Sequence, residues 1–113
     1  MKTYYINHGL SGDEIERLFD KLYAKLEASK KISPANKEDA KALVEEIQST
    51  VADSAQNKEK LDETFLEHRF RNIARMGPDI LDLVVKTLAS PMLGITDLVN
   101  KIAKKAKEET QSG

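Results

Sequence analysis

Apolar positions recur at helical spacing along most of the chain, and the first such stretch follows Ser11. Between Ile15 and Leu26 an apolar side chain returns every third or fourth residue, which is typical of an amphipathic helix. Ser11 and Glu14 form a capping-box pattern, in which a hydroxyl and a carboxylate satisfy free amides of the first turn. The pattern predicts a helix that begins after Ser11 and ends near Lys30.

Two further amphipathic helices are expected before residue 77. Ser33 and Pro34 combine an N-cap with a proline at the first helical position, and a narrow apolar stripe then fades near residues 52–56. Asn57 is the predicted cap of the next helix, about Lys58–Met76. Residues 34–56 carry two lysines and five acids, whereas residues 57–77 carry five cations and four acids. This mild complementarity favours the two helices as antiparallel neighbours.

The segment after Gly77 and Pro78 differs because apolar residues surround most of its helical circumference. A helix of this kind lies in a core, a partner interface or a membrane. We expect it to span about Pro78–Ala89 and to be central. Ser90 and Pro91 repeat the cap-and-proline signal before a last amphipathic helix, and residues 108–113 are expected to fray.

These elements predict an all-α fold, a compact bundle of four to five helices with a short extended N-terminal segment. The predicted division is an extended segment at residues 1–10, a helical bundle at 11–107 and a tail at 108–113. Within the first segment, Thr3–Ile6 is the one β-prone run, and it is too short to be stable alone.

Composition narrows the class of protein. The chain has 113 residues, a formal net charge of −1 and no cysteine, so it forms one domain without disulfides or thiolate chemistry. Its N-terminus lacks the apolar core of a signal peptide, and no window long enough to span a membrane is free of charge. We therefore expect a cytoplasmic protein.

No catalytic, metal-binding or cofactor-binding pattern is evident in the sequence. His8 falls in a predicted loop and His68 on the polar side of a helix, and neither accompanies a nucleophile or paired acids. The spacing around His68 does not match a di-iron motif, because Phe65 stands where that motif requires glutamate. We expect no enzyme activity, no cofactor and no small-molecule substrate.

Asp62 and Arg69 interrupt an otherwise apolar helical arc. An arginine in that setting needs a carboxylate, and Asp79 and Asp82 are the predicted partners; otherwise Arg69 is free to recognise another protein. Arg69, Arg71 and Arg75 together are too few, among neighbouring glutamates, to indicate nucleic-acid binding.

The last helix permits two interpretations. Residues 92–107 pair an apolar stripe with four lysines, as membrane-surface helices do. However, the stripe has no interfacial aromatic residue, and cations near a helix C-terminus also suit the helix dipole. A packed core helix is the preferred interpretation.

Two stretches, INHGLSGDEIERLF and FRNIARMGPDILDLVVKTLASP with the lysine-rich segment after it, carry a resemblance to known proteins. The chain resembles small helical modules at the ends of multidomain bacterial signalling and conflict proteins, which carry STAND-type NTPase or caspase-like effector domains. The resemblance implies a homotypic interaction or adaptor role, or in some relatives a membrane-acting one. The 113 residues themselves include no such NTPase or protease segment.

The sequence therefore predicts a non-enzymatic interaction or adaptor module that binds a protein partner or a second copy of itself, the latter through an apolar surface or through pairing of Thr3–Ile6. The alternative is a membrane-active effector whose Leu81–Val99 region leaves the bundle. The predicted interaction residues are Arg69, Arg71, Arg75, Leu83, Leu88 and Met92.

Overall fold

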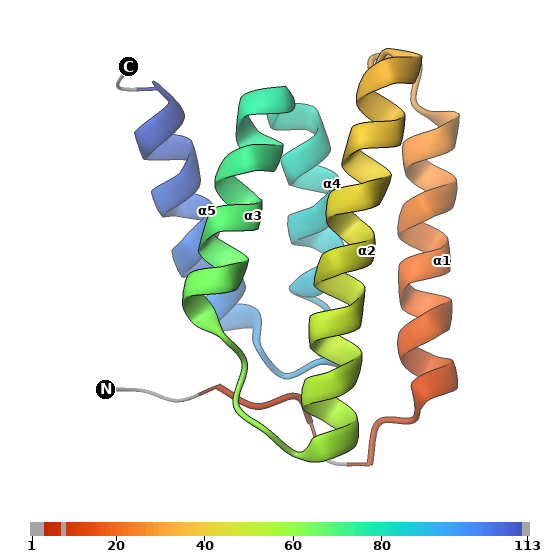
Figure 1. Ribbon diagram of the computed structural model, residues 1–113, viewed down its shortest axis with the longest axis vertical. Coiled ribbons are helices and arrows are strands. Elements are labelled where there is room, and N and C mark those ends of the chain that lie inside the picture. The colour runs from red at the N-terminus through yellow and green to blue at the C-terminus, as the bar shows by residue number, and fades with distance from the viewer. Residues whose placement is uncertain (1–3, 8, 112–113) are drawn as a thin grey trace.

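Five α-helices follow one another along the chain, and each runs antiparallel to the one before it (Figure 1). The computed structural model describes residues 4–7 and 9–111, and this part of the chain contains no strand. The helices are α1 (Gly12–Ala28), α2 (Pro34–Asn57), α3 (Glu63–Met76), α4 (Pro78–Leu88) and α5 (Thr96–Gln111). The all-α prediction is confirmed.

Local sequence signals begin the first two helices as predicted. The Ser11 hydroxyl accepts a hydrogen bond from the backbone N–H of Glu14, with the nitrogen and oxygen 3.1 Å apart. The Ser33 hydroxyl accepts one from the N–H of Asn36 at 3.2 Å, and Pro34 occupies the first turn. Each cap satisfies an amide that the helix itself leaves without a partner.

The junction between α2 and α3 differs from the prediction. α2 continues to Asn57, and Lys58 ends it in the left-handed conformation at φ 55°. The cap of α3 is therefore Asp62, whose carboxylate accepts from the N–H of Phe65 at 3.0 Å. Capping also explains why an acid interrupts the apolar arc at Asp62, since the residue lies before the first turn.

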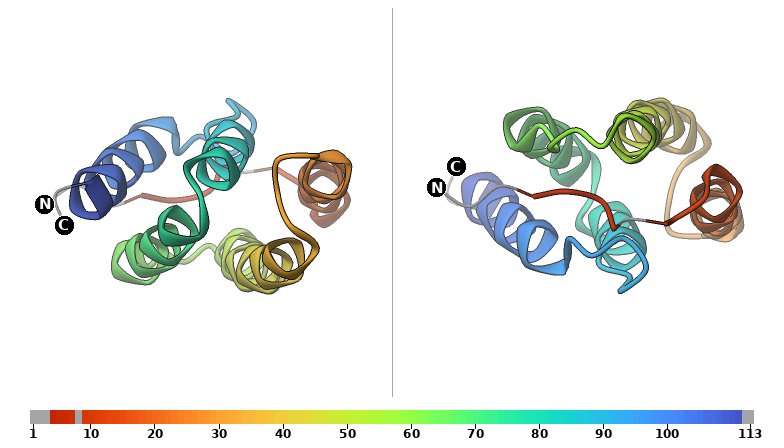
Figure 2. Two further views of the ribbon diagram at one scale, coloured as in Figure 1. Left: turned by 90° about the horizontal axis from the view of Figure 1, so that it is seen from above. Right: turned by 90° about the horizontal axis from the view of Figure 1, so that it is seen from below.

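α4 occupies the central position that its composition predicts. It packs against α1, α3 and α5 and buries Ile80, Leu81, Val84 and Leu88. Figure 2 shows α2 and α3 side by side on one side of the bundle and α4 and α5 on the other, with α1 beside both α2 and α4. The apolar surface of α4 is thus covered by the protein's own helices.

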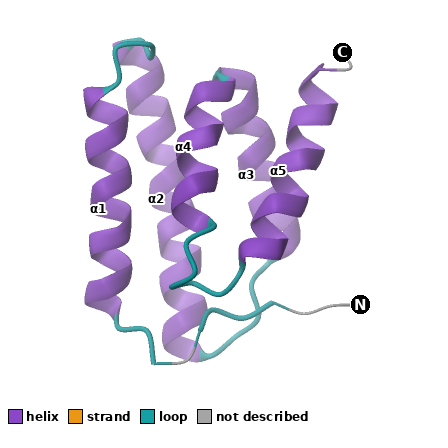
Figure 3. Ribbon diagram, turned by 180° about the vertical axis from the view of Figure 1, so that it is seen from behind, coloured by secondary structure: helices purple, strands orange, loops and turns teal. Residues whose placement is uncertain are grey.

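The N-terminal segment crosses one end of the bundle between two loops (Figure 3). The Tyr4 carbonyl accepts from the N–H of Leu61 at 2.9 Å, and the N–H of Asn7 donates to the Leu93 carbonyl at 3.0 Å. Ile6 between them is buried. Thr3 and His8 lie outside the described residues. The predicted extended segment is therefore fastened by its own chain over residues 4–7.

The last helix begins later and ends later than expected. Ser90 and Pro91 belong to a turn, and α5 begins at Thr96, whose hydroxyl donates to the Ala89 carbonyl at 2.9 Å. The cap-and-proline interpretation at Ser90 was wrong, because the Ser90 carbonyl accepts from the N–H of Leu93 at 3.1 Å and so closes a turn, and Gly94, at φ 73°, follows that turn before α5. α5 runs to Gln111 and so includes residues 108–111, which the sequence assigned to the tail.

Candidate functional site

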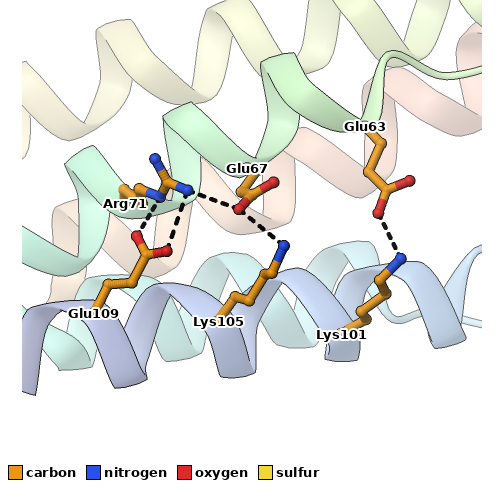
Figure 4. A network of polar contacts seen from close by, with 6 residues as sticks. All are labelled: Glu63, Glu67, Arg71, Lys101, Lys105 and Glu109. Atoms are coloured by element: carbon orange, nitrogen blue, oxygen red, sulfur yellow. Dashed lines mark hydrogen bonds and ion pairs between the residues drawn. The ribbon is translucent and has the colours of Figure 1, made fainter.

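Ion pairs connect the facing sides of α3 and α5 (Figure 4). Lys101 contacts Glu63 with its nitrogen 2.8 Å from the carboxylate oxygen, and Lys105 lies 3.5 Å from Glu67. One turn further along α3, Arg71 donates to Glu67 at 2.8 Å. The residues recur every fourth position on each helix, so one pair follows another along the junction.

Two of these groups have shifted pKa values. Partial burial of the Glu67 carboxyl raises its pKa, but Lys105 and Arg71 together outweigh that effect and hold the pKa below its ordinary value. The hydrogen bond to Glu63 raises the pKa of Lys101. Both groups are therefore charged near neutral pH, and the junction between α3 and α5 stays ionic.

The row of ion pairs ends at Arg71 and Glu109. The Arg71 guanidinium contacts Glu109 through two nitrogens, with Nη2 at 3.2 Å from Oε1 and Nε at 2.5 Å from Oε2. The Nε–H nevertheless makes no hydrogen bond among the described residues, although the atom is buried. The contact between Nε and Glu109 is therefore an ion pair, and the Nε–H does not point at the carboxylate oxygen well enough to form a hydrogen bond.

A cavity of about 590 Å³ opens beside this pair, where the end of α3, the start of α4 and the end of α5 meet. Over the part of the chain that the structure describes, its lining combines three apolar residues, three cations and one acid: Ala74, Pro78, Leu81, Arg71, Arg75, Lys107 and Glu109. Lys107 also contacts Asp82 with its nitrogen 2.8 Å from the carboxylate oxygen. We call this feature the α3–α5 cavity.

The structure separates the three predicted arginines. Arg71 and Arg75 line the α3–α5 cavity, whereas Arg69 faces α2. Arg69 pairs with Glu46 of α2, and its guanidinium lies 4.3 Å from the centre of the Phe65 ring. The predicted partners of Arg69 on α4 were wrong, because Arg69 lies on the side of α3 that packs against α2.

The three predicted apolar interaction residues also differ in exposure. Leu88 is fully buried, so it is a core residue and is unavailable to a partner. Leu83 is half-buried against the core, and Met92 is 41% exposed. Met92 and Leu18 line a second cavity of about 550 Å³, whose other described lining residues are Ser11 and four charged residues of α1: Asp13, Glu14, Arg17 and Lys21.

Sequence reasoning missed Lys107 and Glu109, which complete the α3–α5 cavity from α5. The signal that could have found them is the four-residue period shared by residues 63, 67 and 71 and by residues 101, 105 and 109. Matching acids and cations at that period predict two adjacent helices. The third pair has the opposite arrangement of charges, because the cation Arg71 lies on α3 and the acid Glu109 on α5.

These features define the class of protein: a small all-α domain with a charged cavity at one end of its bundle. Over the described residues, no group of three or more His, Asp or Glu side chains is placed to hold a metal ion. Nor is any helix in that part of the chain both long enough and apolar enough to cross a membrane.

The chain belongs to the ternary complex associated domain 2 family, whose model matches residues 16–109. Comparison with curated proteins and with solved structures gave no match. The family description refers to a complex and therefore suggests a protein-interaction role. It connects the chain with neither STAND-type NTPases nor caspase-like effectors, so that part of the resemblance stays a prediction.

Proposed function

We propose that this domain is a non-enzymatic protein-interaction module that binds a protein partner at the α3–α5 cavity. The family description, with its reference to a ternary complex, supports an interaction role. The resemblance of the sequence to modules of bacterial signalling and conflict proteins supports a place in such a system. His68 is exposed and is not among the described residues that line the cavity.

The observation that carries the proposal is the contrast between a closed core and an open cavity. Among the described residues, most large apolar side chains of the five helices are buried by the chain itself, and the others are partly buried against that core. The cavity combines an apolar floor with charged groups, the mixture that protein interfaces use for an anchor and its rim. A partner could therefore bind there without opening the bundle.

We do not place self-association on the predicted apolar surface. Leu88 is buried, and Met92 is the one member of that set with a large exposed fraction. Among the described residues, the other large apolar side chain with substantial exposure is Tyr5, at 49%. Light scattering on the purified full chain is expected to give the mass of a monomer.

Release of the Leu81–Val99 region onto a membrane is the alternative function. That region supplies Leu81, Leu88, Leu93 and Val99 to the core, all at 0% exposure, so release would remove a large part of the packed interior. Flotation with vesicles rich in phosphatidylglycerol is expected to leave the protein in the dense fraction. Flotation that weakens with salt would favour the membrane alternative instead.

A photo-crosslinking amino acid placed at a defined position tests the binding site. Position 75 lines the cavity, and position 104 on α5 is exposed outside it, so Arg75 and Lys104 offer a matched pair. Irradiation in the native cells is expected to give discrete protein adducts from position 75 and few from position 104. Equal adducts from both positions, or none from position 75, would contradict the proposal.

A further inference from the structure

We infer that the α3–α5 cavity binds an acidic peptide segment through one carboxylate and a neighbouring aliphatic side chain, and that Glu109 competes with that carboxylate for Arg71. This inference rests on the proposed function, because it names the chemistry of the partner at the same site.

The lining of the cavity favours a ligand that has one apolar part and one negatively charged part. Pro78 is exposed and, with the buried Ala74 and Leu81, forms an apolar floor, so an aliphatic side chain could cover Pro78. Arg71 and Arg75 supply planar guanidinium groups, which bind carboxylates through paired hydrogen bonds. A segment that combines an acid with an aliphatic residue satisfies both parts at once.

The charges of the cavity leave room for one more acid. Among the described residues, Arg71, Arg75 and Lys107 line it together with one acid, Glu109. Lys107 contacts Asp82, and Arg75 makes no ion pair among the described residues. Among the described residues, the two arginines of the lining thus share one lining carboxylate, Glu109, while Arg71 also pairs with Glu67 outside the lining.

The same charges disfavour a long polyanion. Asp79 adjoins the lining residue Pro78 in the sequence, Asp82 contacts Lys107, and Glu108 lies between two lining residues. A nucleic-acid strand or an anionic membrane surface would bring further negative charges against these acids. An isolated carboxylate within a peptide avoids that repulsion.

Glu109 already occupies the position that an incoming carboxylate would take at Arg71. Its side chain is 47% exposed, and its contact leaves the buried Arg71 Nε–H without a hydrogen bond. A ligand that approaches along the Nε–H direction would satisfy this donor, which Glu109 does not. Displacing Glu109 therefore exchanges one carboxylate for another with better geometry.

The probe for this inference is a set of nonapeptides that vary the spacing between one leucine and one glutamate, each with a matched glutamine version. Titration into the isotope-labelled full chain is followed by the amide resonances of Ala74, Arg75 and Leu81. At least one glutamate peptide is expected to shift these resonances saturably, and its glutamine version to bind about fivefold more weakly or worse. No saturable shift at the cavity with any peptide would overturn the inference.

Substitutions at the cavity separate competition from a structural role. Glu109→Gln is expected to tighten binding of the glutamate peptide by about twofold to fivefold, because Arg71 loses the carboxylate that competes with the ligand and keeps its pair with Glu67. Arg75→Gln is expected to weaken binding by a similar factor, whereas the exposed Lys104→Gln, outside the lining, leaves it unchanged. Weaker or unchanged binding by Glu109→Gln would overturn the assigned competition.

Two further outcomes distinguish this inference from the proposed function. If position 75 gives protein adducts in cells but no acidic peptide shifts the cavity resonances, the carboxylate chemistry is wrong and the interaction site stands. If phosphatidylglycerol vesicles bind the wild type and Arg75→Gln abolishes that binding, the occupant is a membrane surface and the peptide inference is overturned.

Discussion

At one end of the bundle the segment of residues 4–7 crosses between two loops, whereas the end of α3, the start of α4 and the end of α5 lie at the opposite end (Figure 1). The α3–α5 cavity is lined by residues from those three helices. The first end is held by short, directed hydrogen bonds: backbone bonds at Tyr4 and Asn7, and bonds from the Asn7 side chain to the carbonyls of Pro91 and Met92 at 3.2 and 3.0 Å. The second end is held by long charged side chains such as Arg71 and Glu109.

The difference matters because the two kinds of contact respond differently to a partner. Hydrogen bonds at loop backbones are directional and are lost when the chain shifts. Ion pairs between half-exposed side chains are worth little, and they can be exchanged for other ion pairs. One end of the domain is therefore suited to hold the fold together, and the other to adapt to a ligand.

The largest expected effect on stability comes from Leu88, which is compared with Met92. Both residues lie near the end of the bundle that residues 4–7 cross, but they differ in burial. Leu88→Ala is expected to lower the free energy of unfolding by about 2–5 kcal/mol, because it leaves a cavity in the core. Met92→Ala, at a side chain 41% exposed, should change it by less than about 0.5 kcal/mol. Urea denaturation followed by circular dichroism measures both. Similar losses would contradict the assignment of Leu88 to the core.

The next effect tests the contact between Gly94 and the N-terminal segment. Gly94 has φ 73°, and a Cβ there would overlap the Asn7 amide, so Gly94→Ala combines backbone strain with the displaced side chain. We expect a loss of roughly 2–3 kcal/mol in the free energy of unfolding.

Two other glycines serve as graded controls for Gly94. Gly9 has φ 83° but open space, so Gly9→Ala should cost about 1 kcal/mol from backbone strain alone. Gly12 has open space and no such φ, and Gly12→Ala should be nearly neutral. Removing the amide with Asn7→Ala should restore part of the stability of Gly94→Ala. Equal losses at all three glycines would contradict the role of Asn7.

A smaller effect on stability is expected from Glu67, which pairs with Lys105 and with the cavity residue Arg71. Its folded pKa lies below the ordinary value of 4.5, so it stabilises the protein above that pH and the contribution is lost as pH falls through the lowered pKa. Glu67→Gln should reduce stability at pH 7 by less than about 1 kcal/mol and have less effect at pH 3. Urea denaturation at the two pH values tests this. A larger loss at pH 3 would contradict the sign.

The smallest effect is expected at the rim of the cavity. Arg75 is exposed and makes no ion pair among the described residues, so Arg75→Gln should change the free energy of unfolding by less than about 0.5 kcal/mol. Thermal and urea denaturation of the variant provide the measurement. A decrease of more than about 1 kcal/mol in the free energy of unfolding would show that Arg75 stabilises the fold. It would contradict the description of this end of the bundle as adaptable.

Part of the candidate site could be predicted from the sequence. Arg71 and Arg75 were expected interaction residues, and both line the cavity. Arg69 was grouped with them because it is close in sequence, yet it lies on another side of α3. Side chains two residues apart on a helix point in directions about 200° apart, so a cluster in sequence does not make a cluster on the surface.

Local interactions are what the sequence by itself determined about this protein. A bundle of four to five helices, the caps at Ser11 and Ser33 and the break at Gly77 depend on residues a few positions apart, and spacing alone predicts them. The buried stripe of each helix follows from the same periodicity.

Only the tertiary structure decided which polar groups meet. Arg69 pairs with Glu46, 23 positions away, and Arg71 with Glu109, 38 positions away, while Asn7 reaches Pro91 and Met92. Such contacts depend on how the helices are placed around α4 and on the loop between α4 and α5. Long-range pairs of charged side chains add little energy of their own, so packing of the apolar faces brings them together.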